Sequence, residues 1–147
     1  MNKFTATYTD QYQLSMAQVY FKKGQKEQQA VFDYYFRKLP FKSGYAIFSG
    51  LEDLLEILKK LRFSEDDLEF LKEQGFEKDF LEYLKDFQFK GKIYSVKEGD
   101  IVFPTRPILQ VEASIIEAQI IETILLNLLN FQTLIATKAS RMRLVAG

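Results

Sequence analysis

The chain has 147 residues, of which 47% are hydrophobic and 27% are charged, and its 20 basic and 20 acidic residues give no net charge. This length and composition predict one folded domain with a sizeable core, and the balanced charge argues against attraction to nucleic acid or to an anionic membrane. Cysteine and histidine are both absent, which excludes disulfides, thiol chemistry, Ser–His pairs and the usual zinc sites. The absence of cysteine and of an apolar signal segment among the first residues predicts a cytoplasmic protein.

The first predicted element is a helix over residues 9–22. Thr9 or Asp10 can cap its start, and Gly24 lies just past its end. Four larger side chains fall on one helical face, namely Tyr12, Met16, Val19 and Tyr20. This spacing is typical of an amphipathic helix that packs through one side.

The next stretch changes its period. From residue 32 to residue 37, the aromatic residues Phe32, Tyr34 and Phe36 alternate with Asp33, Tyr35 and Arg37, and most of these residues favour β structure. Pro40 should end this strand, because proline cannot donate to a sheet ladder. Residues 44–50, GYAIFSG, form a second short strand candidate between glycines.

Three short helices are predicted next. The first carries a leucine stripe formed by Leu51, Leu54, Leu55, Leu58 and Leu61. The second opens at residue 64 with a Ser-x-x-Asp signal that approximates a capping box, and it ends at Gly75. The third carries an apolar side formed by Phe80, Leu81, Leu84 and Phe87. The charges between these positions are typical of solvated helix faces.

Residues 89–113 are predicted to form strands. Three short apolar units are separated by turns at residues 98–100 and 104–107. We interpret this block as a small barrel-like sheet with a structural role. It also resembles biotinyl and lipoyl carrier domains, in which a hairpin displays a modified lysine after a similar V-E-A stretch. Here Ser114-Ile115-Ile116 follows Ala113 and no lysine lies at the hairpin position, so the carrier is the less favoured alternative.

Residues 115–136 predict one strongly apolar helix, and a basic run follows at residues 137–147. Glu117, Glu122, Asn127 and Asn130 interrupt the apolar residues, so the helix is not predicted to span a membrane. A helix that is apolar on most faces belongs between the layers of a larger structure, and the residues after it are too few to cover it. The function is therefore expected to belong to a longer protein.

Few residues offer chemistry by themselves. The glycine loops match neither a phosphate-binding P-loop nor a dinucleotide fingerprint. Asp10 is explained most simply as a helix cap and Tyr12 as a packing residue, with ligand contact as the alternative. Lys138, Arg141 and Arg143 either interact with a helix dipole or contact a phosphate or carboxylate. Without histidine or cysteine, neither a complete active site nor a metal site is expected in this chain.

Three ordered stretches point to a family. Residues 9–17 read TDQYQLSMA, residues 32–51 read FDYYFRKLPFKSGYAIFSGL, and residues 98–112 read EGDIVFPTRPILQVE. The chain then closes with IETILLNLLNFQTLIATKASRMRLVAG at residues 121–147. In this order the stretches resemble the N-terminal part of nicotinate phosphoribosyltransferase, and the resemblance covers essentially the whole chain.

The resemblance implies an α+β fold, in which residues 1–113 form the α/β sandwich-like N-terminal domain of a type II phosphoribosyltransferase. Residues 114–147 would form a long helix and the start of an incomplete β/α barrel, the rest of which is missing. Family members are roughly three times longer than this chain, and their barrel carries out catalysis. They join nicotinate to 5-phosphoribosyl 1-diphosphate in NAD biosynthesis, and they couple ATP hydrolysis through a phosphorylated histidine of the barrel. ATP and Mg²⁺ would bind outside this chain, which alone would be inactive.

The same resemblance implies a head-to-tail homodimer with active sites between the subunits. Tyr12, from the T-D-x-Y motif, would reach the partner's site and stack on the pyridine ring, with Asp10 beside it. Arg141, and more weakly Lys138, would contact the carboxylate or phosphate region. The chain would thus contribute substrate-binding residues and no catalytic residue.

Two alternatives stay open. A nicotinamide-specific or quinolinate-specific phosphoribosyltransferase shares the general plan. Quinolinate enzymes have an arginine after the glutamate of the corresponding helix, whereas Thr123 follows Glu122 here, which argues against a dicarboxylate substrate. A non-enzymatic binding module that docks a partner through its C-terminal helix would also fit the apolar sequence.

Overall fold

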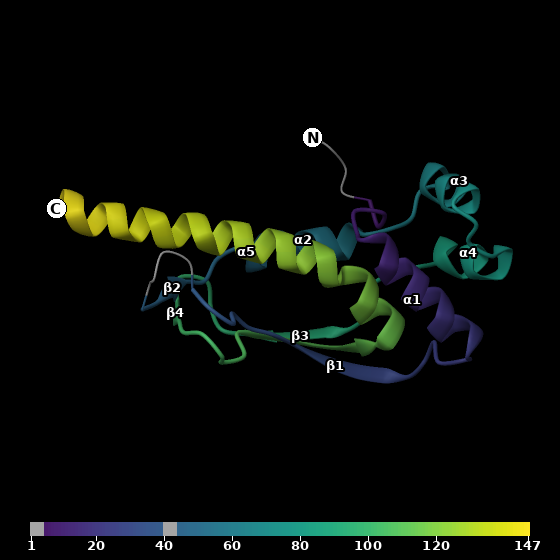
Figure 1. Cartoon of the computed structure of the whole chain (residues 1–147), viewed down its shortest axis with the longest axis horizontal. Coiled ribbons are helices and arrows are strands. Elements are labelled where there is room, and N and C mark those ends of the chain that lie inside the picture. The colour runs from purple at the N-terminus through teal and green to yellow at the C-terminus, as the bar shows by residue number, and fades with distance from the viewer. Residues whose placement is uncertain (1–4, 40–43) are drawn as a thin grey trace.

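The computed structural model of the chain describes residues 5–39 and 44–147, which form an α+β fold. One long helix lies over two small antiparallel sheets, two of the shorter helices pack beside it, and the other two lie at one end of the molecule (Figure 1). In chain order the elements are α1 (Gln11–Lys22), β1 (Gln29–Tyr34), β2 (Ala46–Ile47), α2 (Leu51–Lys60), α3 (Glu65–Glu73), α4 (Lys78–Lys85), β3 (Lys92–Ser95), β4 (Ile101–Val102), β5 (Leu109–Ser114) and α5 (Ile115–Ala146). Each helix and strand expected from the sequence is present, although several bounds differ.

The larger sheet has the strand order β1-β5-β3, and both pairs are antiparallel. β1 shows the predicted alternation, because Phe32 and Tyr34 are partly or fully buried while Val31 and Asp33 are exposed. The strand ends at Tyr34. The predicted stop at Pro40 lies outside the described residues.

The smaller sheet pairs β2 with β4, through Ala46 opposite Val102 and Ile47 opposite Ile101. The expectation of one barrel-like sheet over residues 89–113 is therefore wrong. Its three strands are too few and too short to close a barrel. Instead, β3 and β5 join β1, and β4 joins β2, so strands from the first half of the chain complete both sheets.

The N-terminus of α2 is capped from a distant turn. Glu98 accepts hydrogen bonds from the backbone N–H of Leu51, at 2.8 Å, and from that of Gly50. A carboxylate at this end of a helix also interacts favourably with the helix dipole. Gly50 has a φ of 105°, and a side chain there would lie 3.3 Å from Leu129 and Gln132 of α5. Glycine therefore lets α2 begin in close contact with α5.

The predicted capping box at the start of α3 is confirmed. Ser64 Oγ accepts the backbone N–H of Asp67 at 3.1 Å, and Asp67 Oδ2 accepts that of Ser64 at 2.8 Å. Burial alone would raise the pKa of Asp67, but hydrogen bonds from Thr7 and Ser64 hold this pKa below its usual value. The predicted apolar stripes form the core of this region, with Leu54, Leu58, Leu61, Phe80, Leu81, Leu84 and Phe87 all buried.

α5 begins in a second capping box, in which Ser114 Oγ accepts the Glu117 N–H and Glu117 Oε2 accepts the Ser114 N–H. The helix continues to Ala146, well past the predicted end at residue 136, because residues 137–146 contain no glycine or proline and several good helix formers. In the described part of the chain, α5 alone is long and apolar enough to cross a membrane. A core helix has the same properties, and α5 packs on α1, α2 and both sheets.

Threonine hydroxyls on α5 hold the backbone of earlier segments. Thr133 Oγ1 accepts the Ser49 N–H at 3.2 Å and donates to the Ser49 carbonyl oxygen at 3.2 Å. Thr137 Oγ1 accepts the Ile47 N–H at 2.9 Å. Both threonine side chains are buried, so they satisfy backbone groups that the short strand β2 leaves without a sheet partner.

The buried face of α1 differs from the predicted one. The residues of α1 that are buried are Gln13, Leu14 and Ala17. Of the four side chains predicted to pack, Tyr20 is partly buried against the core, whereas Tyr12, Met16 and Val19 are 54%, 39% and 47% exposed respectively. The small Ala17 side chain lets α1 approach α5 closely, and the Gln13 amide accepts a hydrogen bond from Gln119 on α5. A polar residue of α1 is therefore buried while larger apolar residues of the same helix are exposed.

Candidate functional site

One threonine of α5 holds the start of α1. Thr123 Oγ1 donates to Asp10 Oδ2 at 2.9 Å and accepts the Asp10 backbone N–H at 3.2 Å. Asp10 occupies the capping position of α1, as predicted, but its side chain makes no capping hydrogen bond. Its carboxylate fixes α1 relative to α5 instead. A contact between Asp10 and a ligand stays a prediction.

Tyr12 presents its ring to solvent in the first turn of α1. The side chain is 54% exposed, and its hydroxyl accepts a hydrogen bond from Gln13 Nε2 at 2.7 Å. Partial desolvation and the negative charges of Glu122 and Asp10 raise the pKa of Tyr12 above its usual value. Tyr12 therefore offers a neutral aromatic face and a protonated hydroxyl at neutral pH. These properties suit stacking on a flat ring.

A buried polar chain lies beneath Tyr12. Gln13 is completely buried and Gln119, on α5, is 5% exposed. Gln119 Nε2 donates to Gln13 Oε1 and, at 3.4 Å, to Glu122 Oε2. The two helices are thus joined by paired amides next to the exposed ring. This pairing could not be predicted from the sequence, because an isolated glutamine is most often a surface residue.

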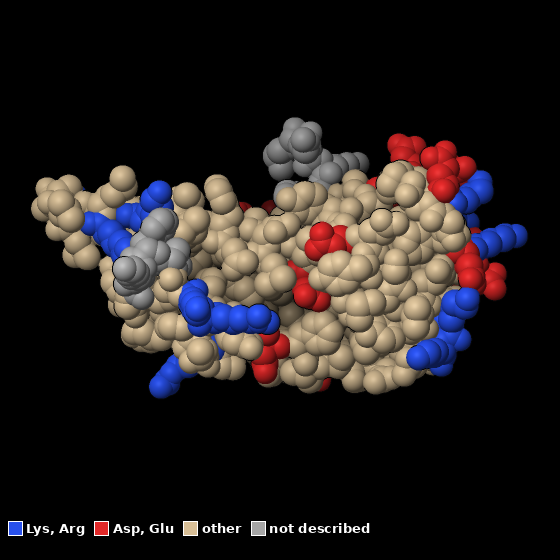
Figure 2. Space-filling model, in the orientation of Figure 1, with Lys and Arg blue, Asp and Glu red and all other residues tan. Residues whose placement is uncertain are grey.

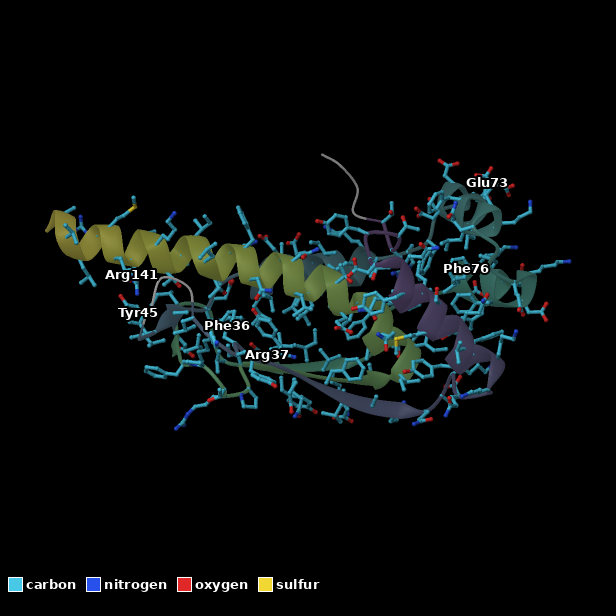
Figure 3. The ribbon with its side chains drawn as sticks, in the orientation of Figure 1. Phe36, Arg37, Tyr45, Glu73, Phe76 and Arg141 are labelled. Atoms are coloured by element: carbon cyan, nitrogen blue, oxygen red, sulfur yellow. The ribbon has the colours of Figure 1, made fainter. Side chains whose placement is uncertain are left out.

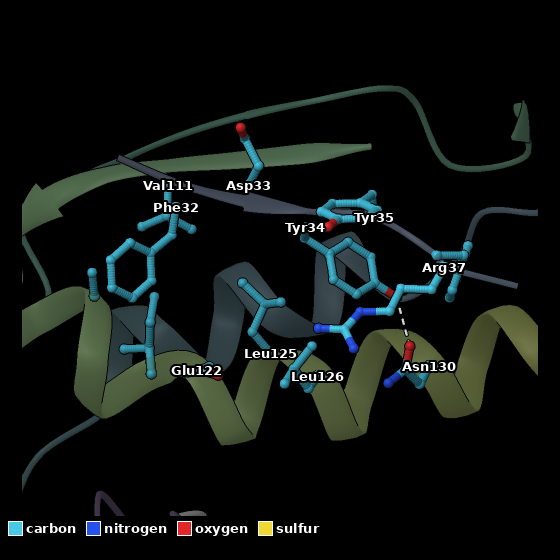
Figure 4. A pocket seen from close by; sticks show the side chains of 13 residues that line it. Phe32, Asp33, Tyr34, Tyr35, Arg37, Val111, Glu122, Leu125, Leu126 and Asn130 are labelled. Carbon is cyan, nitrogen blue, oxygen red and sulfur yellow. Dashed lines mark hydrogen bonds between the residues drawn. The ribbon is translucent and has the colours of Figure 1, made fainter. Parts of the chain in front are cut away.

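A groove of about 670 Å³ lies between β1 and α5 (Figure 4). Its β1 side carries Phe32 and Tyr34, and its α5 side carries Leu125, Glu122 and Asn130. Apolar and aromatic walls with a few polar groups are typical of sites for small organic molecules. Because Glu122 also accepts from Gln119, the groove connects to the polar chain below Tyr12.

Arg37 is a groove residue that the sequence did not single out. Figure 4 shows its guanidinium directed toward α5. Close by, Tyr34 Oη donates to Asn130 Oδ1 at 2.9 Å, and burial raises the pKa of Tyr34 far above its usual value, so both groups are neutral. A guanidinium in such surroundings can bind a carboxylate or phosphate. An arginine just after a strand carries no signal by itself, and only the groove identifies it.

Arg141 lies far along α5 from Tyr12. Its guanidinium is 5.9 Å from the centre of the Tyr45 ring, and Figure 3 shows this pair near the smaller sheet. At about 1.5 Å of rise per residue, Arg141 is roughly 27 Å along the helix from Thr123. The structure therefore does not bring Arg141 and Tyr12 together around one ligand within a single chain.

The basic run at the end of α5 has two parts. Lys138 is exposed one turn before Arg141. Arg143 lies in the last turn of the helix, where a cation interacts favourably with the helix dipole. The simpler explanation of the run holds for Arg143, while ligand contacts by Lys138 and Arg141 stay predictions.

Charge is spread thinly over the face that Figure 2 shows. Basic side chains lie at both ends of this face, acidic side chains gather beside them at the α3–α4 end, and a few charged side chains interrupt a largely uncharged middle (Figure 2). Within residues 5–39 and 44–147, no group of three or more His, Cys, Asp or Glu side chains could hold a metal ion. Mg²⁺ is often held by only one or two carboxylates together with substrate phosphates, so the place where this ion binds stays a prediction.

The junction at residue 114 excludes the carrier alternative. β5 passes directly into α5 through the Ser114–Glu117 capping box. A carrier domain needs a hairpin after this strand to display its lysine, and a helix takes that place. Residues 109–114 therefore have a structural role, as the central strand of the larger sheet.

Comparison with known proteins gives a consistent family. Residues 7–130 match the nicotinate phosphoribosyltransferase (NAPRTase) N-terminal domain. The chain is 50% identical over 141 residues to the nicotinate phosphoribosyltransferase of Bacillus subtilis (strain 168), which covers 95% of this chain and 29% of that protein. It is 38% identical over 149 residues to nicotinate phosphoribosyltransferase 1 of Arabidopsis thaliana, covering 97% and 26% respectively. The chain thus spans less than a third of the length of these relatives.

Solved structures agree with this assignment. The crystal structure of human nicotinic acid phosphoribosyltransferase matches with a TM-score of 0.87 at 34% identity, covering 95% of this chain and 29% of that chain. Nicotinate-nucleotide pyrophosphorylase from Pyrococcus furiosus matches with a TM-score of 0.61 at 21% identity, covering 84% and 24%, and shares the fold alone. The expected α+β fold and the expected resemblance are confirmed. The chain belongs to the nicotinate phosphoribosyltransferase N-terminal domain family.

Proposed function

We propose that this chain is the N-terminal part of an enzyme of NAD biosynthesis that joins nicotinate to 5-phosphoribosyl 1-diphosphate. The products are nicotinate mononucleotide and diphosphate, and ATP is hydrolysed to ADP and phosphate. The family match over residues 7–130 and the 50% identity to the Bacillus subtilis enzyme support this activity. The observation that carries the chain's own role is Tyr12, a half-exposed ring fixed at the start of α1.

Tyr12 contributes binding and orientation. Its raised pKa keeps the hydroxyl protonated at neutral pH, so its phenol does not act as a base. Displacement at the ribose carbon passes through an oxocarbenium-like state, in which correct placement of the pyridine nitrogen and stabilisation of charge lower the barrier. A ring held by a rigid helix supplies that placement without ordering a mobile loop.

We infer a head-to-tail homodimer in which Tyr12 serves the partner subunit's site. Tyr12, Met16 and Val19 form an exposed, largely apolar face of α1, and such faces are typical of subunit contacts. Arg141 lies roughly 27 Å along α5 from Thr123, so one chain presents Tyr12 and Arg141 to different ligands. In this arrangement Arg141 and Lys138 contact carboxylate or phosphate groups in the other site of the dimer.

The remaining parts of the proposal concern the whole protein. Residues 1–113 form its N-terminal domain, and residues 114–147 form the long helix that leads into an incomplete β/α barrel. We assign ATP, Mg²⁺ and the phosphorylated histidine to the part of the enzyme that this chain does not cover, and the chain itself contains no histidine. The enzyme is cytoplasmic, and the 147-residue chain alone is inactive.

Nicotinate is the proposed substrate, in preference to nicotinamide or quinolinate. The position after Glu122 holds Thr123, whose hydroxyl is bound to Asp10, so no cation is available there for a second carboxylate. A non-enzymatic docking module is the second candidate, because Phe131, Ile135 and Val145 are exposed on α5. The same side chains also suit packing against a catalytic domain.

Turnover by the complete protein separates these candidates. We expect nicotinate mononucleotide to form from nicotinate and 5-phosphoribosyl 1-diphosphate, with stimulation by ATP and Mg²⁺. With nicotinamide or quinolinate, kcat/KM should be at least about a hundredfold lower, as expected when a site for one carboxylate leaves polar groups unpaired. A folded protein that does not turn over nicotinate, or that prefers one of the other pyridines, overturns the proposal.

A further inference from the structure

We propose that Gln13 and Gln119 are positioning residues that hold the Tyr12 hydroxyl as a hydrogen-bond acceptor and so direct its proton toward the ligand. This inference rests on the proposed role of Tyr12 in nicotinate binding. It concerns the support of the ring, which comes from inside this chain. Both glutamines are buried between α1 and α5 and neither can reach a ligand.

The two amides have little freedom. Gln13 is completely buried and Gln119 is 5% exposed, and buried amide groups need hydrogen-bond partners to avoid a desolvation penalty. Gln119 Nε2 donates to Gln13 Oε1, and Gln13 Nε2 donates to the Tyr12 hydroxyl at 2.7 Å. The buried Gln13 NH₂ group therefore has a hydrogen-bond partner only when it donates to the Tyr12 hydroxyl.

Glu122, at the inner end of this series of hydrogen bonds, fixes which group of each glutamine donates and which accepts. The Glu122 carboxylate can only accept, and it takes a hydrogen bond from Gln119 Nε2 at 3.4 Å. Both protons of that amide nitrogen are thus directed to Glu122 and to the Gln13 carbonyl. The Gln13 carbonyl consequently faces Gln119, and its NH₂ group must face Tyr12.

The consequence for Tyr12 follows from its single proton. Because the Tyr12 oxygen accepts on the protein side, its O–H is directed away from the helix pair. Among the residues that the structure describes, none accepts a hydrogen bond from this O–H. An anionic oxygen on the ligand side is its natural acceptor. The half-exposed ring of Tyr12 is also held in one orientation before a ligand binds, which reduces the conformational entropy lost on binding.

A double-mutant cycle in the complete protein tests the inference. The pair Gln13→Met and Gln119→Met removes both partners of the buried contact at nearly constant volume, so neither amide is left unpaired. Tyr12→Phe removes the hydroxyl alone. We expect either change to raise the KM for nicotinate about tenfold with kcat altered little, and the combination to have no larger effect than Tyr12→Phe.

The control is a glutamine elsewhere in the same chain. Gln110 donates to Asp33 at 2.9 Å on the open face of the larger sheet, so Gln110→Met makes the same chemical change away from Tyr12. It should leave the nicotinate KM unchanged. If the methionine pair does not fold, Gln13→Asn keeps an amide but is one methylene too short to bridge Gln119 and Tyr12, and the same rise in KM is expected.

A second measurement does not depend on activity. In protein labelled with ¹³C at the phenolic carbon of tyrosine, the Tyr12 resonance should shift in the methionine pair and stay in place in Gln110→Met. An unchanged resonance, an unchanged KM in the methionine pair, or effects that multiply with that of Tyr12→Phe, would overturn the inference. An unchanged KM in Tyr12→Ala would instead overturn the proposed role of Tyr12 itself, so the two failures are distinguishable.

Discussion

Replacement of Thr123 by valine tests whether α5 holds the start of α1 in place. Valine keeps the side-chain shape but removes the hydroxyl that donates to Asp10 Oδ2 at 2.9 Å and accepts the Asp10 N–H at 3.2 Å. Each such bond contributes about 0.5–1.5 kcal/mol net. Since the exposed Asp10 carboxylate regains water, we expect a total loss of about 1–2 kcal/mol. For a domain of this size, that lowers the unfolding midpoint by about 3–8 °C.

The functional effect of Thr123→Val should exceed what the stability loss explains. Tyr12 lies two residues after Asp10, so a displaced helix start moves its ring, and the nicotinate KM should rise severalfold. Thr133→Val is the control, because the Thr133 hydroxyl also bridges one residue: it accepts the Ser49 N–H and donates to the Ser49 carbonyl oxygen, each at 3.2 Å. Thr133 is roughly 15 Å further along α5.

Thermal unfolding and steady-state kinetics on the two variants decide the matter. Both variants should lose stability, Thr133→Val at least as much as Thr123→Val because Thr133 is the more deeply buried of the two, and only Thr123→Val should raise the nicotinate KM. Equal rises in both variants would show that general loosening of the fold causes the effect. A normal nicotinate KM in Thr123→Val, at reduced stability, would show that the Asp10–Thr123 contact does not position Tyr12.

Three further predictions concern the fold. Gly91→Ala should destabilise the protein by about 1–3 kcal/mol in thermal unfolding, because the added carbon would lie 2.5 Å from Ala113 Cβ; wild-type stability would contradict the close packing there. Glu98→Ala should cost about 1–2 kcal/mol, because α2 loses the acceptor at its N-terminus, and a neutral result would show that water replaces it. The pKa of Asp67 is lower in the folded than in the unfolded protein, so the ionised carboxylate stabilises the fold at pH values above the unfolded pKa of about 3.9. This stabilisation is lost as the pH falls through the folded pKa. The destabilisation by Asp67→Asn, measured by urea unfolding, should therefore shrink in acid, and a constant value would contradict this role of the carboxylate.

Local signals in the sequence were reliable predictors of the helices. The Ser64–Asp67 capping box and the leucine stripe of α2 depend on residues a few positions apart. The structure confirms the capping box and most of the stripe, in which only Leu55 is exposed. The arrangement of strands could not be predicted in the same way. β5 pairs with β1, which is more than seventy residues earlier in the chain, and the apolar pattern of a strand does not name its neighbours.

The candidate site was predictable only where a motif marked it. Tyr12 and Asp10 stood out through the T-D-x-Y stretch, whereas their supports did not. Gln13 and Gln119 are polar, and a hydropathy pattern places them at the surface, although pairing lets both lie buried. Arg37 follows the end of β1, and only its position in the groove identifies it as a candidate ligand-binding residue. Tertiary contacts between distant segments decide each of these cases.

The nicotinate KM of Tyr12→Ala in the complete protein measures whether Tyr12 binds nicotinate. We expect this KM to rise strongly, with kcat reduced less and the unfolding midpoint nearly unchanged, because the side chain is half exposed and packs little against the core. A nicotinate KM equal to that of the unaltered protein would contradict the claim that this chain presents Tyr12 to the pyridine ring.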